Sequence, residues 1–278
     1  MKIINHRLCR DDDTPYPFRA SPNIGDALNP SFLVMHYTAG RNFDQSVNWL
    51  VNPAAKASAH LVVGRDGSVI QLVAFNKVAW HAGSSSWQGY TGLNNYSIGI
   101  ELDNVGIVNP SPTGDFRTWF GDPIPIEQVI QAQHKNETVS RYWQLYTPEQ
   151  LFTALEIAGT LIQHYGLKDI LGHDDIAPGR KSDPGPAFPM MTFRSRLLGR
   201  SDSVSDEGGT YVTTANLHIR KTPDQNGATL PNSPLPKDTR LKATGEETGV
   251  WKEVEVLDNV KNLKGQIGWV HSRFIVAK

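Results

Sequence analysis

The chain has 278 residues, longer than a typical single domain, so we expect one larger and one smaller domain. Its 39% hydrophobic and 20% charged content fits a globular protein and argues against a disordered or fibrous one. A net charge of −1 argues against nucleic-acid binding through a basic surface, and a single cysteine excludes an intrachain disulfide and a Cys-rich zinc site.

The first predicted elements are one strand, a short helix and a hairpin. The apolar run 32–37 predicts a strand, and Asp44 is expected to cap a brief helix that ends at Leu50. The segments 60–63 and 68–73 flank a Gly-Arg-Asp-Gly turn sequence, which predicts a β-hairpin.

The next segments are a strand and a long stretch without a regular pattern. Residues 97–102 alternate in polarity, so Glu101 is expected on the more polar face of a strand. The stretch 104–146 contains four prolines and two tryptophans and has little periodicity. We predict an irregular insertion there, either at the rim of a functional site or merely decorative.

The clearest helix is predicted over 147–165. Thr147 is the expected N-cap, a proline fits the first helical position, and Gln150 would complete a capping box. Apolar residues recur at helical spacing, and Gly166 is suited to end the helix in a left-handed conformation. Strands mixed with helices predict an α/β body over residues 1–200, with a mixed central β-sheet flanked by helices.

A Ser-, Asp- and Gly-rich segment at 201–210 predicts a linker to a small all-β domain at 211–278. From Thr210 onward the chain carries 10 basic and 7 acidic residues, a net charge of +3, against −4 before it. Short β-like runs separated by turn residues support the all-β prediction, at 215–220, 239–244, 251–257 and 265–270.

Polar groups follow apolar strands in three fragments of the larger domain, at 35–40, 172–175 and 179–185. Catalytic zinc takes three nitrogen or oxygen ligands and keeps a fourth position open for water. His36, His173 and Asp183 can supply such a set. Spacing alone does not make the set unique, because His60, His81 and several acids are also available.

These fragments resemble the type 2 family of N-acetylmuramoyl-L-alanine amidases, which is related to phage amidases and peptidoglycan recognition proteins. The family motifs are a strand ending in H-Y-T, an I-G-I-E strand, a G-H-x-D-I-x-P-G-R-K-x-D-P-G segment, and the shorter S-x-H-L and W-H-A-G. The resemblance covers roughly residues 32–198. The matching segments of this chain are 36–38, 98–101, 172–185, 58–61 and 80–83.

The resemblance implies one zinc ion per chain, bound by His36, His173 and Asp183, and a catalytic pair formed by Glu101 and Lys181. Zinc brings the pKa of bound water toward ~7, and Glu101 would move the proton of that water to the leaving amine. Lys181 would stabilise the oxyanion formed on the carbonyl oxygen. A solvated lysine in a loop is the alternative.

Other residues of the motifs have weaker roles by resemblance. Tyr37, Thr38, His60 and His81 are expected to line the substrate site without binding the metal. Arg180 has no assigned role, since surface exposure and pairing with a substrate carboxylate are equally open. The remaining histidines are expected in structural or surface positions, namely His6, His134, His164, His218 and His271.

The tail carries a second resemblance. Leu217-His218-Ile219-Arg220 and Gly268-Trp269-Val270 are similar to the opening and closing signatures of bacterial SH3-like domains. This implies an SH3-like β-barrel that binds the cell wall, and a net positive tail suits an anionic polymer. A purely structural cap is the alternative.

The resemblance as a whole implies hydrolysis of the amide between N-acetylmuramic acid and L-alanine, in peptidoglycan or in muropeptides, with no nucleic acid and no protein partner. Two alternatives are a non-catalytic peptidoglycan-binding protein and a peptidase that cuts within the stem, although the sequence has no H-E-x-x-H helix.

The implied location is the cell envelope, periplasmic or extracellular. The sequence has no run of about 20 apolar residues that would span a membrane. Its N-terminus also lacks the apolar core of a signal peptide, so recycling of muropeptides in the cytoplasm stays an alternative.

Overall fold

The computed structural model describes residues 1–112, 114–199, 209–248 and 250–277. The chain divides into two compact units, Met1–Gly199 and Arg200–Lys278. Most of the expected linker at 201–210 lies outside the described residues. No helix in the described ranges is long and apolar enough to cross a membrane.

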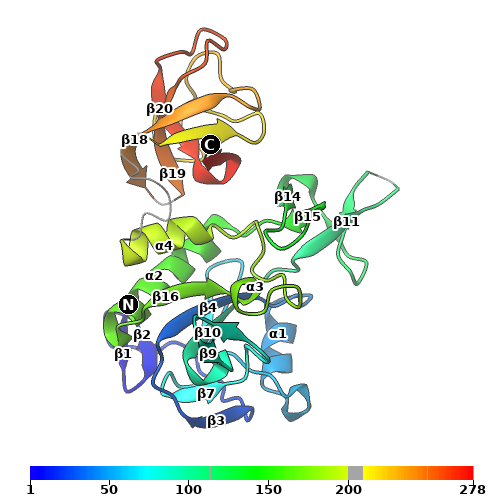
Figure 1. Cartoon of the computed structure of the whole chain (residues 1–278), viewed down its shortest axis with the longest axis vertical. Coiled ribbons are helices and arrows are strands. Elements are labelled where there is room, and N and C mark those ends of the chain that lie inside the picture. Colours follow the sequence, from blue (N-terminus) through cyan, green and yellow to red (C-terminus); the bar gives the residue numbers. More distant parts are fainter. Residues whose placement is uncertain (113, 200–208, 249, 278) are drawn as a thin grey trace. The chain divides into compact units, whose positions relative to one another are not determined.

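A five-stranded mixed sheet forms the centre of the first unit, in the order β16-β4-β10-β5-β6 (Figure 1). Strands β16, β4, β10 and β5 run parallel, and β6 pairs antiparallel with β5 in the predicted hairpin. The predicted mixed central sheet is therefore confirmed. The strand bounds are Phe32–Tyr37 for β4, Leu61–Val63 for β5, Val69–Gln71 for β6, Ser97–Leu102 for β10 and Asp169–Gly172 for β16.

The middle strands are buried on both faces, as near-continuous apolar runs in parallel sheets usually are. Leu33, Val34 and Met35 of β4 have no exposed surface, and Ile98 and Ile100 of β10 are equally buried. The alternation seen in β10 therefore separates two buried faces. It does not separate an inner face from a solvated one.

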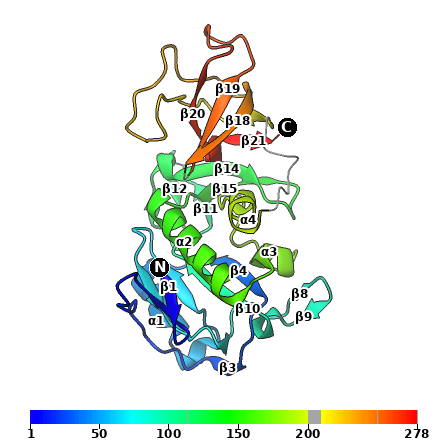
Figure 2. The same ribbon diagram turned by 90° about the vertical axis from the view of Figure 1, so that its left-hand side faces the viewer.

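In the described ranges, four α-helices accompany this sheet, and Figure 2 shows α2 lying along it with α4 nearby. On α1, Val47 and Leu50 pack into one apolar cluster with Val62 of β5. The helix bounds are Phe43–Leu50 for α1, Pro148–Tyr165 for α2, His173–Ile176 for α3 and Met190–Leu198 for α4.

The predicted cap of α1 is wrong by two positions. Asn42 is the N-cap, and its side-chain oxygen accepts a hydrogen bond from the backbone N–H of Gln45 at 3.0 Å. Asp44 lies in the first turn instead, where its negative charge still favours the helix N-terminus.

The predicted bounds of α2 are confirmed, with Thr147 as N-cap and Gly166 in the left-handed conformation at its end. The capping box is only half present. The side-chain amide of Gln150 donates to the carbonyl oxygens of Val63 and Asp103, at 3.0 and 3.1 Å, and does not return to Thr147. Gln150 therefore ties the start of the helix to the ends of β5 and β10.

The stretch predicted as an irregular insertion contains a β-sheet of its own. Five short strands form a second sheet in the order β13-β12-β11-β15-β14, which projects beside the central sheet in Figure 1. It has its own small core of Val105, Val108, Phe116 and Ile124. The strand bounds are Ile107–Pro110 for β11, Phe116–Arg117 for β12, Pro123–Ile124 for β13, Val129–Gln133 for β14 and Ser140–Gln144 for β15.

The part of the first unit that the structure describes also has three two-stranded pairs, β1 with β2, β3 with β7 and β8 with β9. Their bounds are Lys2–Ile4 for β1, Arg7–Cys9 for β2, Ile24–Ala27 for β3, Lys77–Ala79 for β7, Ser86–Trp87 for β8 and Tyr90–Thr91 for β9.

The second unit is an antiparallel five-stranded sheet in the order β20-β19-β18-β17-β21. The runs expected at 239–244, 251–257 and 265–270 correspond to β18, β19 and β20, so the predicted β-structure of the C-terminal part is confirmed. The strand expected at 215–220 is wrong, because this segment makes only isolated bridges. The bounds are Thr210–Thr213 for β17, Arg240–Thr248 for β18, Trp251–Val256 for β19, Ile267–His271 for β20 and Ile275–Ala277 for β21.

Candidate metal centre

The topology brings the three sequence fragments to one edge of the central sheet. His36 lies near the end of β4 and is paired in register with Glu101 of β10. His173 follows directly after β16, the other neighbour of β4. Because these strands are parallel, their carboxyl ends meet at one edge, where open α/β sheets usually bind ligands. The backbone N–H of Asp174 donates to the carbonyl of Asp183 at 2.8 Å, which folds the following loop back onto this edge.

Three side-chain atoms converge there. His36 Nδ1 lies 3.0 Å from His173 Nδ1 and 2.9 Å from Asp183 Oδ2, and His173 Nδ1 lies 3.0 Å from the same oxygen. One N–H cannot satisfy all three contacts at once. All three residues are buried, with exposed fractions of 1%, 3% and 7%. A buried cluster of converging acceptor atoms is the arrangement that a cation stabilises.

The partners of the outer imidazole nitrogens fix which nitrogen faces this point. His173 Nε2 lies 3.1 Å from the Ala82 carbonyl, which can only accept, so Nε2 carries the hydrogen and Nδ1 keeps its lone pair. His36 Nε2 lies 2.9 Å from His81 Nδ1, and His81 Nε2 lies 3.3 Å from the Ser97 carbonyl. His81 therefore donates to Ser97 and accepts from His36, which leaves the lone pair of His36 Nδ1 free as well.

Electrostatics keep these groups in the forms that bind a metal. Burial and the neighbouring His173 lower the pKa of His36 to about 4, so its imidazole is neutral at pH 7. Burial would raise the pKa of Asp183, but its close contacts with His173 and His36 outweigh burial and hold the pKa below its ordinary value. Burial likewise lowers the pKa of His81.

The donor set fits zinc. Two neutral imidazole nitrogens and one carboxylate oxygen are the ligand types of open catalytic zinc sites. Donor atoms that are 2.9 to 3.0 Å apart can all lie about 2.0–2.2 Å from one common point, the usual length of zinc–nitrogen and zinc–oxygen bonds. His36, His173 and Asp183 form the one such group of three or more ligand residues within the described ranges.

Glu101 is the carboxyl group next to this cluster. Its Oε2 atom is buried and makes no hydrogen bond within the described part of the chain. Burial and the nearby charge of Asp183 raise the pKa of Glu101 to about 8, and the positive charge of Lys181 offsets part of that rise. Burying a carboxyl oxygen without a hydrogen bond costs free energy of folding. Such groups are often found at catalytic sites.

Two of the weaker candidates, His60 and His81, lie behind the cluster. His81 packs against β10 at Gly99, where an added Cβ would come within 2.4 Å of the imidazole ring. His60 is fully buried, and its Nδ1 accepts from the Gly99 N–H while its Nε2 donates to the Lys77 carbonyl. The glycine of the I-G-I-E strand thus makes room for His81, a role that the sequence patterns did not reveal.

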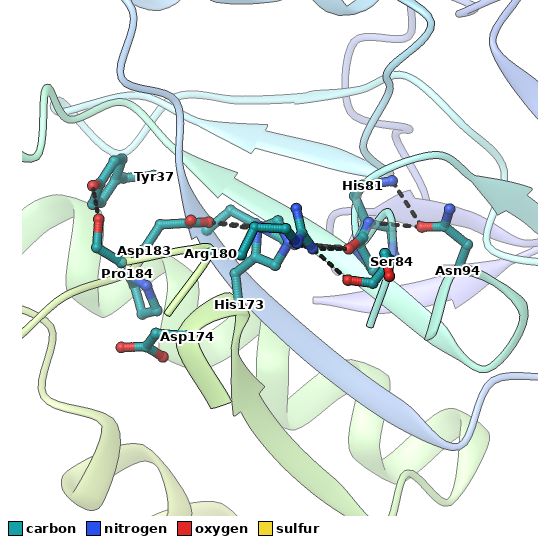
Figure 3. Close-up of polar contacts among 12 residues, drawn as sticks. Tyr37, His81, Ser84, Asn94, His173, Asp174, Arg180, Asp183 and Pro184 are labelled. Atoms are coloured by element: carbon teal, nitrogen blue, oxygen red, sulfur yellow. Dashed lines mark hydrogen bonds and ion pairs between the residues drawn. The ribbon is translucent and has the colours of Figure 1, made fainter. Parts of the chain in front are cut away.

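Tyr37 and Thr38 lie on the other side of the β4 end. The Tyr37 hydroxyl is 2.9 Å from Ser182 Oγ, so it contacts the loop that carries Lys181 and Asp183 (Figure 3). Burial raises the pKa of Tyr37 to about 12, and the phenol stays neutral. Thr38 lines a groove that also reaches Glu101.

Arg180, which had no assigned role, reaches across to the loop after β7. Its guanidinium donates to the carbonyls of Ala82 and Ser84 at 2.9 and 2.6 Å, and it lies 3.4 Å from His173 Nε2 (Figure 3). It therefore fixes the loop whose Ala82 carbonyl orients His173. Lys181 is exposed beside it.

Comparison with known proteins agrees with this geometry. The Amidase_2 family model, described as N-acetylmuramoyl-L-alanine amidase, matches residues 26–186, more than half of the chain. The chain belongs to the N-acetylmuramoyl-L-alanine amidase family. The match spans all three converging ligands, Glu101 and Lys181, and it ends before the second unit.

Individual relatives lie within the same amidase family. The chain is 34% identical over 176 residues to N-acetylmuramoyl-L-alanine amidase AmiD of Escherichia coli strain K12, covering 60% of this chain and 53% of AmiD. It is 30% identical over 215 residues to 1,6-anhydro-N-acetylmuramyl-L-alanine amidase AmpD of Citrobacter freundii, covering 70% of this chain and 88% of AmpD. The alignments thus span about half the length of AmiD and most of this AmpD.

A crystal structure of a selenomethionine AmpD derivative superimposes on this amidase-family chain with a TM-score of 0.49 at 27% identity. The superposition covers 71% of this chain and 99% of that one.

Proposed function

We propose that the chain is a zinc-dependent amidase that hydrolyses the amide between N-acetylmuramic acid and L-alanine. The observation that supports this most directly is the convergence of His36, His173 and Asp183 within 3.0 Å of one another. Beside them lies the Oε2 atom of Glu101, which has no hydrogen-bond partner among the described residues. Family membership supplies the class of bond.

A zinc ion held by those three residues would lower the pKa of bound water toward ~7 and polarise the scissile carbonyl. Glu101 then accepts a proton from the attacking water and returns it to the nitrogen of the leaving L-alanine. In the metal-free chain, burial and the charge of Asp183 raise the pKa of Glu101 to about 8, which favours the protonated form that donates to the leaving nitrogen. The positive charge of a bound zinc ion would favour the ionised form that accepts the proton from water. Within the described part of the chain, no protein group forms a hydrogen bond with Oε2 that would compete with the reactants.

Lys181 is proposed to stabilise the negative charge that develops on the carbonyl oxygen. It is exposed, and its positive charge acts on both Glu101 and His36, which supports a position close to the reacting atoms. A single donor to such an oxyanion contributes about 3 kcal/mol to the transition state.

The proposed substrate is peptidoglycan or a muropeptide released from it. The relatives' names give two forms of the sugar, N-acetylmuramoyl and 1,6-anhydro-N-acetylmuramyl, joined to the same L-alanine. The same hydrolytic chemistry therefore serves both forms.

The second unit is proposed to be an SH3-like domain that binds the cell wall. Its support is the antiparallel five-stranded sheet, the two short signatures around Leu217 and Trp269, and a net charge of +3 beside an anionic polymer. A wall-binding module would also suit a site of action in the cell envelope.

The test of the proposed function is the Glu101→Gln variant. The change is nearly isosteric and leaves the three metal ligands in place, so the zinc content should match the parent while hydrolysis of a muropeptide slows by about 10²-fold or more. Elemental analysis and steady-state kinetics measure the two quantities. A variant with the parent's zinc content and a rate within a few-fold of the parent would refute the proton-transfer role of Glu101.

A further inference from the structure

An open groove of about 750 Å³ leads away from Glu101 along one side of the sheet edge. Its size falls within the range of about 300–1,000 Å³ that is usual for small-molecule sites. One wall is the loop after β4 together with α1, and the other includes the turn between β12 and β13. The residues that line it are Thr38, Ala39, Gly40, Arg41, Gln45, Ser46, Trp49, Leu50, Glu101, Trp119 and Phe120.

The β12–β13 turn is fixed onto the loop after β4. Trp119 Nε1 donates to the carbonyl of Ala39 at 2.9 Å. Arg41 binds Asp122 through two hydrogen bonds of 2.7 and 2.8 Å, and its guanidinium lies 5.2 Å from the centre of the Phe120 ring. The insertion therefore contributes a fixed wall to the groove that contains Glu101.

Two tryptophans of this groove stay largely exposed. Trp49 of α1 is 57% exposed and Trp119 is 69% exposed, although the indole N–H of Trp119 is already bonded. Exposed aromatic faces that line the same groove as a candidate catalytic carboxyl group are a feature of ligand binding more than of folding.

The charges of the groove favour a neutral ligand. Among the described residues that line it, Arg41 is the one cation, and it is paired with Asp122. The other polar lining groups besides Glu101 are hydroxyl or amide groups, on Thr38, Ser46 and Gln45. The loop that carries Asp183 differs, because Lys181 is exposed and Arg180 is held by carbonyl oxygens. The carboxylates of a peptide would therefore pair with cationic side chains on that loop and not in the groove.

We propose that this groove binds the sugar side of the substrate and that Trp49 and Trp119 are its stacking surfaces. The faces of N-acetylhexosamine rings present C–H groups, which pack on the electron-rich faces of indoles, while hydroxyl and acetamido groups suit the neutral polar lining. Glu101 lies at the junction, where the lactyl carbonyl joins the sugar to the stem. This inference rests on the proposed amidase function and assigns the two sides of its substrate.

The experiment uses the full chain and two separate probes, the peptide-free disaccharide of N-acetylglucosamine and N-acetylmuramic acid, and the sugar-free stem peptide. Titration calorimetry compares the parent with Trp49→Ala and Trp119→Ala. Both variants should bind the disaccharide about tenfold or more weakly, as truncation of an aromatic anchor commonly does, and should bind the stem peptide as the parent does.

Two control variants separate stacking from other effects. Phe152 of α2 is 61% exposed and lies outside the groove, so Phe152→Ala should leave both affinities unchanged. Trp119→Phe keeps an aromatic face but loses the bond to the Ala39 carbonyl, so it should retain most of the disaccharide affinity if stacking is the main contribution.

Disaccharide binding that is unchanged in both alanine variants would overturn the sugar assignment, as would an equal loss for the stem peptide. A parent that binds the stem but not millimolar disaccharide would overturn it too. These binding measurements need no hydrolysis. If the parent bound both probes as expected yet left muropeptides intact, the amidase function would fail while the groove assignment stood.

Discussion

The pKa of Glu101 predicts how the stability of the metal-free protein depends on pH. The folded protein raises this pKa from the ordinary value of 4.5 to about 8. A raised carboxyl pKa means that the folded state holds its proton longer than the unfolded chain does. The favourable contribution is therefore fully present below pH 4.5 and is lost as the pH rises through 8. Glu101→Gln removes this ionisable group, so the variant should not show the decrease in unfolding free energy that Glu101 causes at high pH.

The magnitude follows from about 1.4 kcal/mol per pH unit between the two pKa values. From pH 5 to pH 9 the parent should lose about 4 kcal/mol of unfolding free energy through Glu101 alone, and Glu101→Gln should not. Urea unfolding of both proteins after removal of metal by a chelator, at pH 5 and pH 9, measures the difference. The unfolding free energy of Glu101→Gln should increase relative to that of the parent as the pH rises.

Glu127→Gln is the matched control, because Glu127 is an exposed carboxyl group of the same unit. Its stability should follow the parent at both pH values. The reasoning is refuted if Glu101→Gln and the parent change in parallel between pH 5 and pH 9, since the Glu101 carboxyl group would then be no harder to ionise in the folded state than in the unfolded chain.

Four further predictions concern the metal, the reaction and the tail. His173→Ala should lose zinc and activity together, and full zinc occupancy by elemental analysis would contradict the ligand assignment. His81→Ala should weaken zinc binding about 10–100-fold in a competition titration, because it orients His36 through a 2.9 Å contact, and unchanged affinity would argue against that role. Lys181→Ala should lower the rate constant by about 10²-fold, as loss of an oxyanion donor does, and an unchanged rate would make Lys181 a solvated loop residue. Residues 1–200 alone should cleave a soluble muropeptide but sediment far less with insoluble peptidoglycan than the full chain, whereas equal sedimentation would remove the targeting role of the tail.

Much of the sheet edge was predictable from local signals. The apolar run before His36 and the strand before His173 appear in the structure as expected, and the helix from Thr147 to Gly166 has the bounds its capping residues predicted. Motif resemblance selected three ligand candidates among nine histidines and many acids, and the structure brings those three within 3.0 Å of one another.

What the sequence did not reveal depends on contacts between distant segments. The strands of the insertion are two to five residues long and include prolines. Strands this short show no clear alternation of polar and apolar residues, so the sequence did not predict them. Trp119 belongs to the groove only because its turn binds Ala39, 80 positions earlier. Asn42 displaced Asp44 as the helix cap because both are good capping residues and the chain path decides between them.

The most direct test of the central claim is the mass of the products formed from a defined muropeptide by the zinc-loaded chain. Two products are expected that together gain one water, a sugar that keeps its lactyl carboxylic acid and a stem peptide that begins with free L-alanine. Both should disappear after chelation and return when zinc is restored. A product cut within the stem or between sugars, or unchanged cleavage in metal-free protein, would contradict the central claim.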